Sequence, residues 1–423
     1  MISKEVLRQV VYAQKATPFD VEKTVRREQL PEVLAGFNDN RVLILTGIRR
    51  CGKSTLLRQI ISEQKAPWCY VSFEDERFLD FKAQDFELLN EVLMEAYGTP
   101  TIYFFDEIQN VEHFEAFVRR LQDQGKKVVL TGSNAALLSG ELGTRLTGRY
   151  KTFELYPFSF REFLAFKNVH MSKEDSYQTE EKVKLLKLFE QYLTQGGFPE
   201  YLKNQDNEYL RTIYENILYR DIIARYGIKR QRTLRELANT LATNPSSKIT
   251  YNALKKTLGL ANAMTVKEYL AHLANAYLFF ELPQFDFSIK KQLNAPKKTY
   301  SIDTAFNRLM SINTSANKGR TLENVVFLEL KRKGMEIYYH QTNHTECDFL
   351  TKQGTKIKQV IQVCQTLEPG NQKRELAGLL DALQKFNLKE GLLLTHEQEQ
   401  ELNIESKTIH VRPVWKWLAF PIK

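Results

Sequence analysis

Short, continuous apolar runs separated by helical stretches mark the segment from residue 41 to about residue 157. These runs lie at residues 42–45, 68–73, 101–105 and 128–130. Strands that are apolar at successive positions suit burial on both faces, and their alternation with helices is typical of an α/β fold. The pattern therefore predicts a parallel sheet with flanking helices, preceded by one N-terminal helix and a connecting loop.

The rest of the chain changes character three times. It is first helical and rich in Phe, Tyr, Lys and Glu, then helical followed by strand-like. From about residue 318 it mixes amphipathic helices with three or four short strands. Polar residues before residue 318 suit a linker. We expect four regions, at residues 1–157, 158–230, 231–310 and 318–423.

Composition narrows the class of protein. Of the 423 residues, 43% are hydrophobic and 26% are charged, a globular balance that excludes a disordered or fibrous chain. The net charge of +9 suits an anionic partner without requiring one. Four scattered cysteines argue against a disulfide scaffold or a zinc module. No apolar run approaches a membrane span and no signal peptide is recognisable, so we expect a soluble, cytoplasmic protein.

The first apolar run leads directly into a G-x-x-x-x-G-K-[ST] sequence, and an apolar-periodic helix follows it. Such a loop wraps a polyphosphate with its backbone N–H groups and the positive helix N-terminus. Lys53 would contact the β and γ phosphates, and Ser54 would coordinate Mg²⁺. The predicted ATP-binding loop comprises Gly47, Ile48, Arg49, Arg50, Cys51, Gly52, Lys53, Ser54 and Thr55.

Two adjacent carboxylates end the third apolar run, the arrangement of a Walker B strand. Asp106 would hold Mg²⁺ through water, and Glu107 would polarise the attacking water. A kinase needs no such glutamate, so the pair favours hydrolysis over phosphoryl transfer to a metabolite.

Together these motifs resemble a group of bacterial and archaeal AAA-type ATPases that carry a C-terminal domain of unknown function. The resemblance rests on G-I-R-R-C-G-K-S-T, Y-V-S-F-E-D, Y-F-F-D-E-I-Q, L-T-G-S-N and L-Y-P-F-S-F-R-E-F, and later on Q-G-G-F-P-E-Y, Y-R-D-I-I and G-R-T-L-E-N. It implies an AAA-type P-loop ATPase domain, a helical lid or linker, a winged helix and a nuclease-like α/β end domain.

Two further ATPase roles follow from the same resemblance. The fourth run resembles a sensor-1 strand, with Asn134 as the first choice and Ser133 as the second. Arg149, or alternatively Arg145, would act as an arginine finger in a neighbouring subunit's site, which implies a homo-oligomeric ring. Cys51, inside the loop, is either a packing residue or an oxidation-sensitive one.

The third region fits a winged helix. Thr250 suits the N-cap of one helix and Asn262 that of a second, whose buried stripe holds Val266, Leu270, Leu273 and Tyr277. A β-hairpin then carries lysines. The candidate DNA contacts are Thr265, Lys267, Lys290, Lys291, Lys297 and Lys298, beside Glu268. Subunit contact or an ATPase lid remains the alternative role.

The last region has the layout of a PD-(D/E)xK nuclease, in which carboxylates hold Mg²⁺ and a lysine orients water. Glu323 and Asp348 match the acids and Gln362 is a tolerable replacement, but Cys364 occupies the lysine position. Lys352 or Lys358 would have to reach the site from elsewhere. We therefore expect a degenerate core used for binding or assembly, rather than an active nuclease.

Three functions fit these features. The first is an ATPase that uses Mg²⁺-ATP turnover to move along or remodel DNA. The second is a nucleotide-gated switch or scaffold for protein partners, and the third is an ATP-dependent nuclease.

Overall fold

The computed structural model describes residues 2–17, 19–133, 148–311 and 318–420. The chain divides into two compact units, Met1–Tyr156 and Pro157–Lys423. No helix among these residues is long and apolar enough to cross a membrane.

The N-terminal unit is built on a five-stranded parallel sheet in the order β2-β3-β4-β1-β5. The predicted parallel sheet is therefore confirmed, and β5 adds a fifth strand with a more polar sequence. The strands are β1 (Val42–Gly47), β2 (Trp68–Ser72), β3 (Ile102–Asp106), β4 (Lys127–Gly132) and β5 (Tyr150–Leu155).

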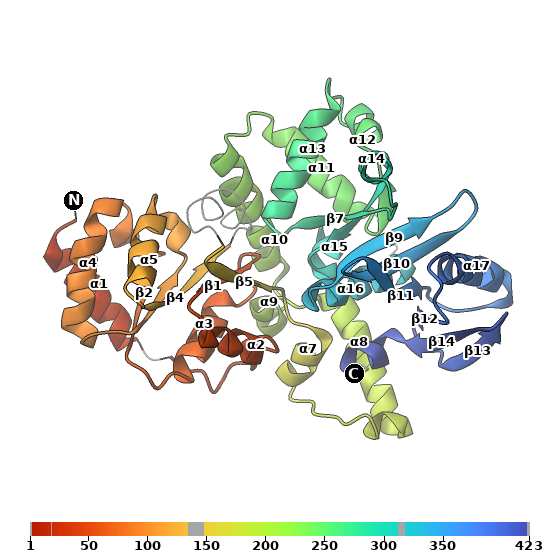
Figure 1. Cartoon of the computed structure of the whole chain (residues 1–423), viewed down its shortest axis with the longest axis horizontal. Helices are drawn as coiled ribbons and strands as arrows, with labels where there is room; N and C mark the ends of the chain where they lie inside the picture. The colour runs from red at the N-terminus through yellow and green to blue at the C-terminus, as the bar shows by residue number, and fades with distance from the viewer. Residues whose placement is uncertain (1, 18, 134–147, 312–317, 421–423) are drawn as a thin grey trace. The chain divides into compact units, whose positions relative to one another are not determined.

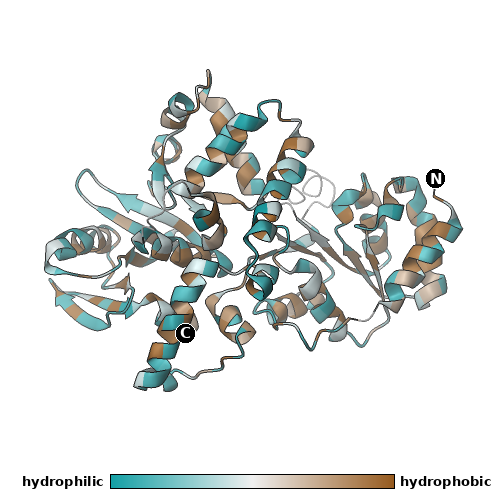
Figure 2. Cartoon of the chain, turned by 180° about the vertical axis from the view of Figure 1, so that it is seen from behind, coloured by the Kyte–Doolittle hydropathy of each residue, from teal (hydrophilic) through white to brown (hydrophobic). Residues whose placement is uncertain are grey.

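Helices cover both faces of this sheet (Figure 1). They are α1 (Lys4–Ala16), α2 (Leu30–Ala35), α3 (Lys53–Ser62), α4 (Phe86–Tyr97) and α5 (Phe114–Asp123). Apolar residues of α1, α4 and α5 share one core with alternate residues of β1, β3 and β4. Hydrophobic positions form stripes along the helices, with polar positions on the outer sides (Figure 2). The apolar strands are thus buried between two helical layers, which leaves their carboxyl ends free to carry polar groups.

The second unit begins with helices. They are α7 (Phe160–Phe166), α8 (Thr179–Gln195), α9 (Pro199–Asn204), α10 (Asn207–Asn216), the π-helical segment η7 (Ile217–Ala224), α11 (Gln231–Thr243), α12 (Tyr251–Thr257) and α13 (Ala263–Asn275). The two expected N-caps are present, because Thr250 accepts a hydrogen bond from Ala253 N–H and Asn262 from Met264 N–H. The expected stripe of α13 is buried as well.

A small antiparallel sheet, β6-β8-β7, follows these helices. It consists of β6 (Ser247–Ile249), β7 (Phe279–Pro283) and β8 (Lys297–Ser301), and α14 (Ile289–Asn294) connects β7 to β8. The three-residue strand β6 is too short for a recognisable pattern. After β8 come α15 (Thr304–Met310) and α16 (Lys318–Arg332).

A six-stranded mixed sheet forms the C-terminal part, in the order β13-β14-β12-β11-β10-β9. Its elements are β9 (Glu336–Gln341), β10 (Glu346–Gln353), β11 (Lys356–Val363), α17 (Pro369–Lys385), β12 (Glu390–Thr395), β13 (Gln400–Ile404), β14 (Lys407–Pro413) and α18 (Val414–Ala419). Three or four strands were expected. The edge strand β13 was missed because it is short, mostly polar and exposed, and it is held by pairing with β14.

Candidate functional site

The glycine-rich loop connects the carboxyl end of β1 to the start of α3. Gly47 ends the strand with φ at 147°, and Gly52 precedes the helix with φ at 100°. A Cβ atom on Gly47 would lie only 2.0 Å from the Leu155 carbonyl oxygen. Glycine at this position is therefore required by both conformation and space. The loop places backbone N–H groups and the first turn of α3 around one point, which suits a polyphosphate.

Lys53 turns its ammonium group back over this loop. Its Nζ atom lies 3.3 Å from the carbonyl oxygens of Gly47 and Ile48 and 3.5 Å from Glu107 Oε1. Burial lowers the pKa of Lys53, but Glu107, Cys51 and Asp106 together outweigh this effect and raise the pKa. Lys53 is thus a buried, charged group held loosely enough by three partners to exchange them for phosphate oxygens.

Asp106 stands at the carboxyl end of β3, beside the loop. Phe105 pairs with Leu130 in the sheet, so the next residue of each strand brings Asp106 next to Thr131. The Thr131 hydroxyl donates to Asp106 Oδ1, and the Tyr70 hydroxyl donates to Oδ2 at 3.2 Å. Burial raises the pKa of Asp106, while hydrogen bonds from Thr131 and Ser54 act in the opposite direction. The hydrogen bond with Ser54 places the two predicted magnesium-binding residues together.

Glu107 follows directly and adopts a left-handed conformation, with φ at 51°. Its N–H donates to Thr131 Oγ1 at 2.8 Å, and its carboxylate accepts a hydrogen bond from Gln109. Burial would raise the pKa of Glu107, but Lys53, Gln109 and Arg49 lower it. The unusual φ turns the side chain away from the strand and toward Lys53, a conformation that costs free energy and recurs at functional sites.

Arg27 supports the loop through a hydrogen bond to its backbone, and sequence analysis did not recognise it as a site residue. Its guanidinium donates to the carbonyl oxygens of Cys51 at 2.7 Å and Tyr156 at 2.8 Å, and the residue is 3% exposed. Its backbone N–H donates to the Gln59 side chain on α3. In the sequence, Arg27 stands beside Arg26 in a loop that follows the first helix. Such a pair carries no signal for this role, which depends on contacts across the fold.

These residues fit a magnesium–nucleotide complex. Carboxylate and hydroxyl oxygens are ligands that Mg²⁺ accepts, and Asp106 and Ser54 supply one of each. The loop glycines, Lys53 and the N-terminus of α3 supply groups for phosphate oxygens. Glu107 provides a carboxylate beside them. The arrangement is suited to binding a nucleoside triphosphate and polarising a water molecule.

The remaining ATPase predictions have different outcomes. Ser133 is 3% exposed, just past the end of β4. Asn134 and Arg145 lie outside the described residues. Cys51 is fully buried, and burial raises the pKa of its thiol, as expected for a packing residue.

Arg149 is exposed and donates to Asp123 at 2.7 Å. Its carbonyl oxygen accepts from Val42 N–H at the start of β1, whereas the phosphate loop follows the end of that strand. Five strand residues separate the two positions by about 17 Å. Arg149 is therefore too far away to act in its own chain's site.

The candidate DNA contacts do not all remain available. Lys267 on α13 and Lys290 and Lys291 on α14 are exposed, and Thr265 is partly buried. Lys297 donates to carbonyl oxygens at the end of α14. The expectation for Lys298 was wrong, because this residue is 2% exposed and forms ion pairs with carboxylates.

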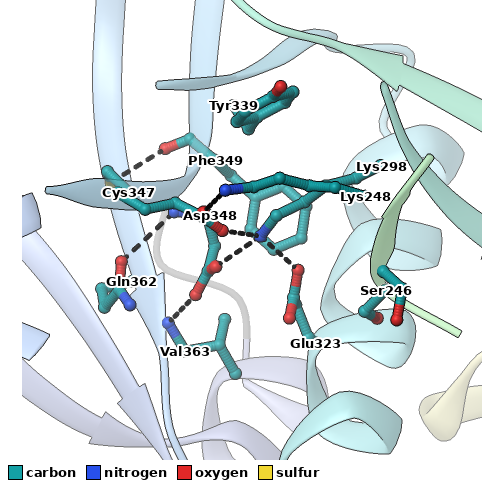
Figure 3. Close-up of polar contacts among 12 residues, drawn as sticks. Ser246, Lys248, Lys298, Glu323, Tyr339, Cys347, Asp348, Phe349, Gln362 and Val363 are labelled. Carbon is teal, nitrogen blue, oxygen red and sulfur yellow. Dashed lines mark hydrogen bonds and ion pairs between the residues drawn. The ribbon is translucent and has the colours of Figure 1, made fainter. Parts of the chain in front are cut away.

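Three of the expected nuclease-like residues, Glu323, Asp348 and Gln362, line a cavity of about 470 Å³ in the second unit, and Cys364 is buried. Glu323 on α16 and Asp348 on β10 both contact Lys298 (Figure 3). The alternative lysines do not take part. Lys352 pairs with Glu336 at 2.8 Å, and Lys358 is exposed. Sequence analysis missed Lys298 as the lysine of this cluster because it lies on β8, outside the motif.

Comparison with known proteins finds two family models that match parts of this chain. A family model described as an AAA domain matches residues 39–164, and a model described as a domain of unknown function (DUF8612) matches residues 186–316. Among solved structures, the Walker-type ATPase PABY2304 of Pyrococcus abyssi is 17% identical with a TM-score of 0.43, covering 68% of this chain and 96% of that one. The Aeropyrum pernix ORC1 protein, solved in complex with DNA, is 10% identical with a TM-score of 0.29, covering 73% and 97%.

The parallel sheet, the loop and the AAA-domain match define a P-loop domain of AAA type. The uncharacterized protein MJ1544 of Methanocaldococcus jannaschii is 34% identical over 436 residues, covering 99% of this chain and 96% of that protein. An uncharacterized protein of Haemophilus influenzae is 32% identical over 413 residues, covering 93% and 98%. The chain belongs to the family of AAA-domain proteins that includes MJ1544.

Proposed function

We propose that this protein is a Mg²⁺-dependent ATPase that works on DNA. The cluster of Lys53, Asp106 and Glu107 at one edge of the sheet carries the ATPase part. Mg²⁺ would offset phosphate charge, held by Ser54 and Asp106. Lys53 would bind the β and γ phosphates, and Glu107 would accept a hydrogen bond from the attacking water and polarise it.

The pair formed by Lys53 and Glu107 supports this division of roles. The lysine keeps the pKa of the glutamate low, so Glu107 is a carboxylate able to accept a proton or hydrogen bond. Thr131 fixes the backbone at Glu107 and the carboxylate of Asp106 at once. With nucleotide present, we expect Asp106 to hold Mg²⁺ and Glu107 to polarise the attacking water.

Replacement of Glu107 tests the hydrolytic role directly. Glu107→Gln should bind ATP as tightly as the unaltered protein and lose at least about a hundredfold in turnover, the usual contribution of a positioned general base. Glu112→Gln, an exposed acid nearby, is the matched control and should keep its turnover. Equal turnover in both variants would exclude Glu107 from the reaction.

The DNA part of the proposal rests on the winged-helix interpretation of residues 231–310. The exposed lysines of α13 and α14, Lys267, Lys290 and Lys291, would meet phosphate groups. DNA should raise the ATPase rate, and its affinity should fall steeply with salt because binding releases counterions. A Lys290→Ala/Lys291→Ala variant should lower both affinity and salt dependence, whereas Lys356→Ala/Lys358→Ala, on exposed β11 positions, should not.

A protein partner is the second candidate, favoured by one observation. Phe287, Ile289 and Leu293, around α14, are 79%, 72% and 64% exposed beside the lysines. Exposed apolar groups of this size are more typical of protein contacts than of phosphate contacts. If DNA neither binds nor stimulates at low salt, this surface points to the switch or scaffold function instead.

A further inference from the structure

Strands β6 and β8 of the small sheet carry two lysines to the carboxylates of the C-terminal part. Lys248 and Lys298 are directly opposite each other across these strands, a like-charge pairing that is unfavourable by itself. Both lysines form ion pairs with acidic side chains. Lys298 contacts Glu323, Glu346 and Asp348, and Lys248 contacts the other oxygen of Glu346. Figure 3 shows the two side chains pointing into the acidic group.

The Lys298 ammonium lies against all three of the acids that it contacts. Its Nζ atom lies 2.8 Å from Glu323 Oε1, 2.8 Å from Glu346 Oε1 and 2.7 Å from Asp348 Oδ1. It donates hydrogen bonds to Glu323 and Asp348 and forms an ion pair with Glu346, so its charge is directed at the carboxylates. With the side chain 3% exposed, this ammonium is enclosed at the point on which the three carboxylates converge.

The other positions of the nuclease-like motif are engaged as well. The Gln362 side-chain oxygen accepts from Asp348 N–H at 3.2 Å, and its Nε2 donates to Glu375 at 2.7 Å. The second oxygen of Asp348 accepts from Val363 N–H at 2.9 Å. Cys364 supplies a buried thiol at the motif position where a lysine is expected, and burial raises its pKa to about 12. These residues therefore do not fit a divalent metal.

The acids of the cluster face cations of the chain itself. Three carboxyl groups lie against two ammonium groups, and burial together with Asp348 raises the pKa of Glu323. Tyr300, two residues after Lys298 on the same side of β8, donates to Glu323 at 2.6 Å. Within the described ranges, no group of three or more His, Cys, Asp and Glu residues is arranged to hold a metal.

We propose that Lys298 is a resident cation that takes the place of a divalent metal in this nuclease-like cluster. The ammonium links the small sheet to α16 and β10, and the cluster serves as a metal-independent joint within the second unit. Removing the ammonium should leave converging carboxylates and so create a divalent-cation site where the unaltered chain has none.

Manganese binding to the full-length chain tests this directly. An Asp106→Asn background without nucleotide removes the metal ligand of the ATPase site, and free Mn²⁺ is followed by electron paramagnetic resonance. In the chain that keeps Lys298, Asp348→Asn should leave the amount of bound Mn²⁺ unchanged. Lys298→Met should gain one Mn²⁺ that an added Asp348→Asn removes. Lys297→Met, the adjacent control, should gain none.

Thermal unfolding covers the case in which Lys298→Met is unstable. Its melting temperature should be low in a chelator and rise with Mn²⁺, by linkage, whereas that of the chain with Lys298 should not change. An Asp348-dependent Mn²⁺ in the chain with Lys298, or plasmid cleavage that Asp348→Ala abolishes, would overturn the proposal. So would a folded Lys298→Met chain that binds no additional Mn²⁺.

Discussion

Thr131 and Asp106 lie side by side at the carboxyl ends of β4 and β3, and the Thr131 hydroxyl donates a hydrogen bond to the Asp106 carboxylate. The same hydroxyl accepts from Glu107 N–H at 2.8 Å. One side chain thus sets the position of both acids of the proposed ATPase site.

Replacement of Thr131 should slow turnover while leaving nucleotide binding nearly intact. Thr131→Val keeps the shape and removes both hydrogen bonds, so Asp106 and Glu107 lose their common support. We expect a fall of about tenfold or more, the equivalent of one hydrogen bond to a charged group. Steady-state ATPase rates and nucleotide titration measure the two effects, and Thr131→Ser should restore most of the rate. A Val variant as fast as the unaltered chain would contradict this role.

Loss of the Arg27 guanidinium should loosen the phosphate loop. Arg27→Ala leaves the Cys51 and Tyr156 carbonyl oxygens without their charged donor. We expect weaker ATP binding and a loss of about 2–3 kcal/mol in the free energy of unfolding, which denaturant titration measures. Arg26→Ala removes a neighbouring arginine that pairs with Glu63 on the surface and should change either quantity little. Equal effects of the two substitutions would show that Arg27 has no special role.

Two glycine substitutions separate backbone strain from loss of space. Gly47→Ala places a methyl group against the Leu155 carbonyl oxygen, so it should deform the loop and abolish ATP binding. Gly125→Ala also forces a positive φ, but it meets nothing within 4 Å and should cost only about 1 kcal/mol of stability. ATP titration and thermal unfolding of both variants are the measurements. Tight ATP binding by Gly47→Ala would show that the loop tolerates the side chain.

Arg149 should act in a neighbouring subunit. Arg149→Ala should bind ATP and hydrolyse it at least about a thousandfold more slowly, the lower end for arginine fingers. Mixing it with Lys53→Ala chains, themselves inactive, should restore turnover because each supplies what the other lacks. Arg119→Ala, whose side chain also approaches Asp123, is the control and should remain active. An unchanged rate in Arg149→Ala alone would refute the assignment.

The four cysteines should resist a thiol reagent while the chain is folded. All four are buried, and burial raises the pKa of each thiol. Because the thiolate is the reactive form, labelling with a chromogenic disulfide at pH 8 should be slow until denaturant is added, and should then reach four per chain. Rapid native labelling of Cys51 that ATP prevents would instead support the oxidation-sensitive alternative.

Local spacing was enough to predict the parallel sheet, the phosphate loop and the acid pair of the ATPase domain. The reason is that each lies within a short stretch whose periodicity or motif is set by neighbouring residues. Gly47 to Thr55 form one turn between a strand and a helix, and Asp106 and Glu107 end one strand.

Folding decided the partners that come from distant parts of the chain. Thr131 reaches Asp106 across 25 residues, and Lys298 reaches Asp348 across 50. Strand register and packing make these contacts, and neither leaves a local pattern. A lysine in a basic hairpin was therefore interpreted as a phosphate contact, although in the folded chain it is buried against the carboxylates of Glu323, Glu346 and Asp348.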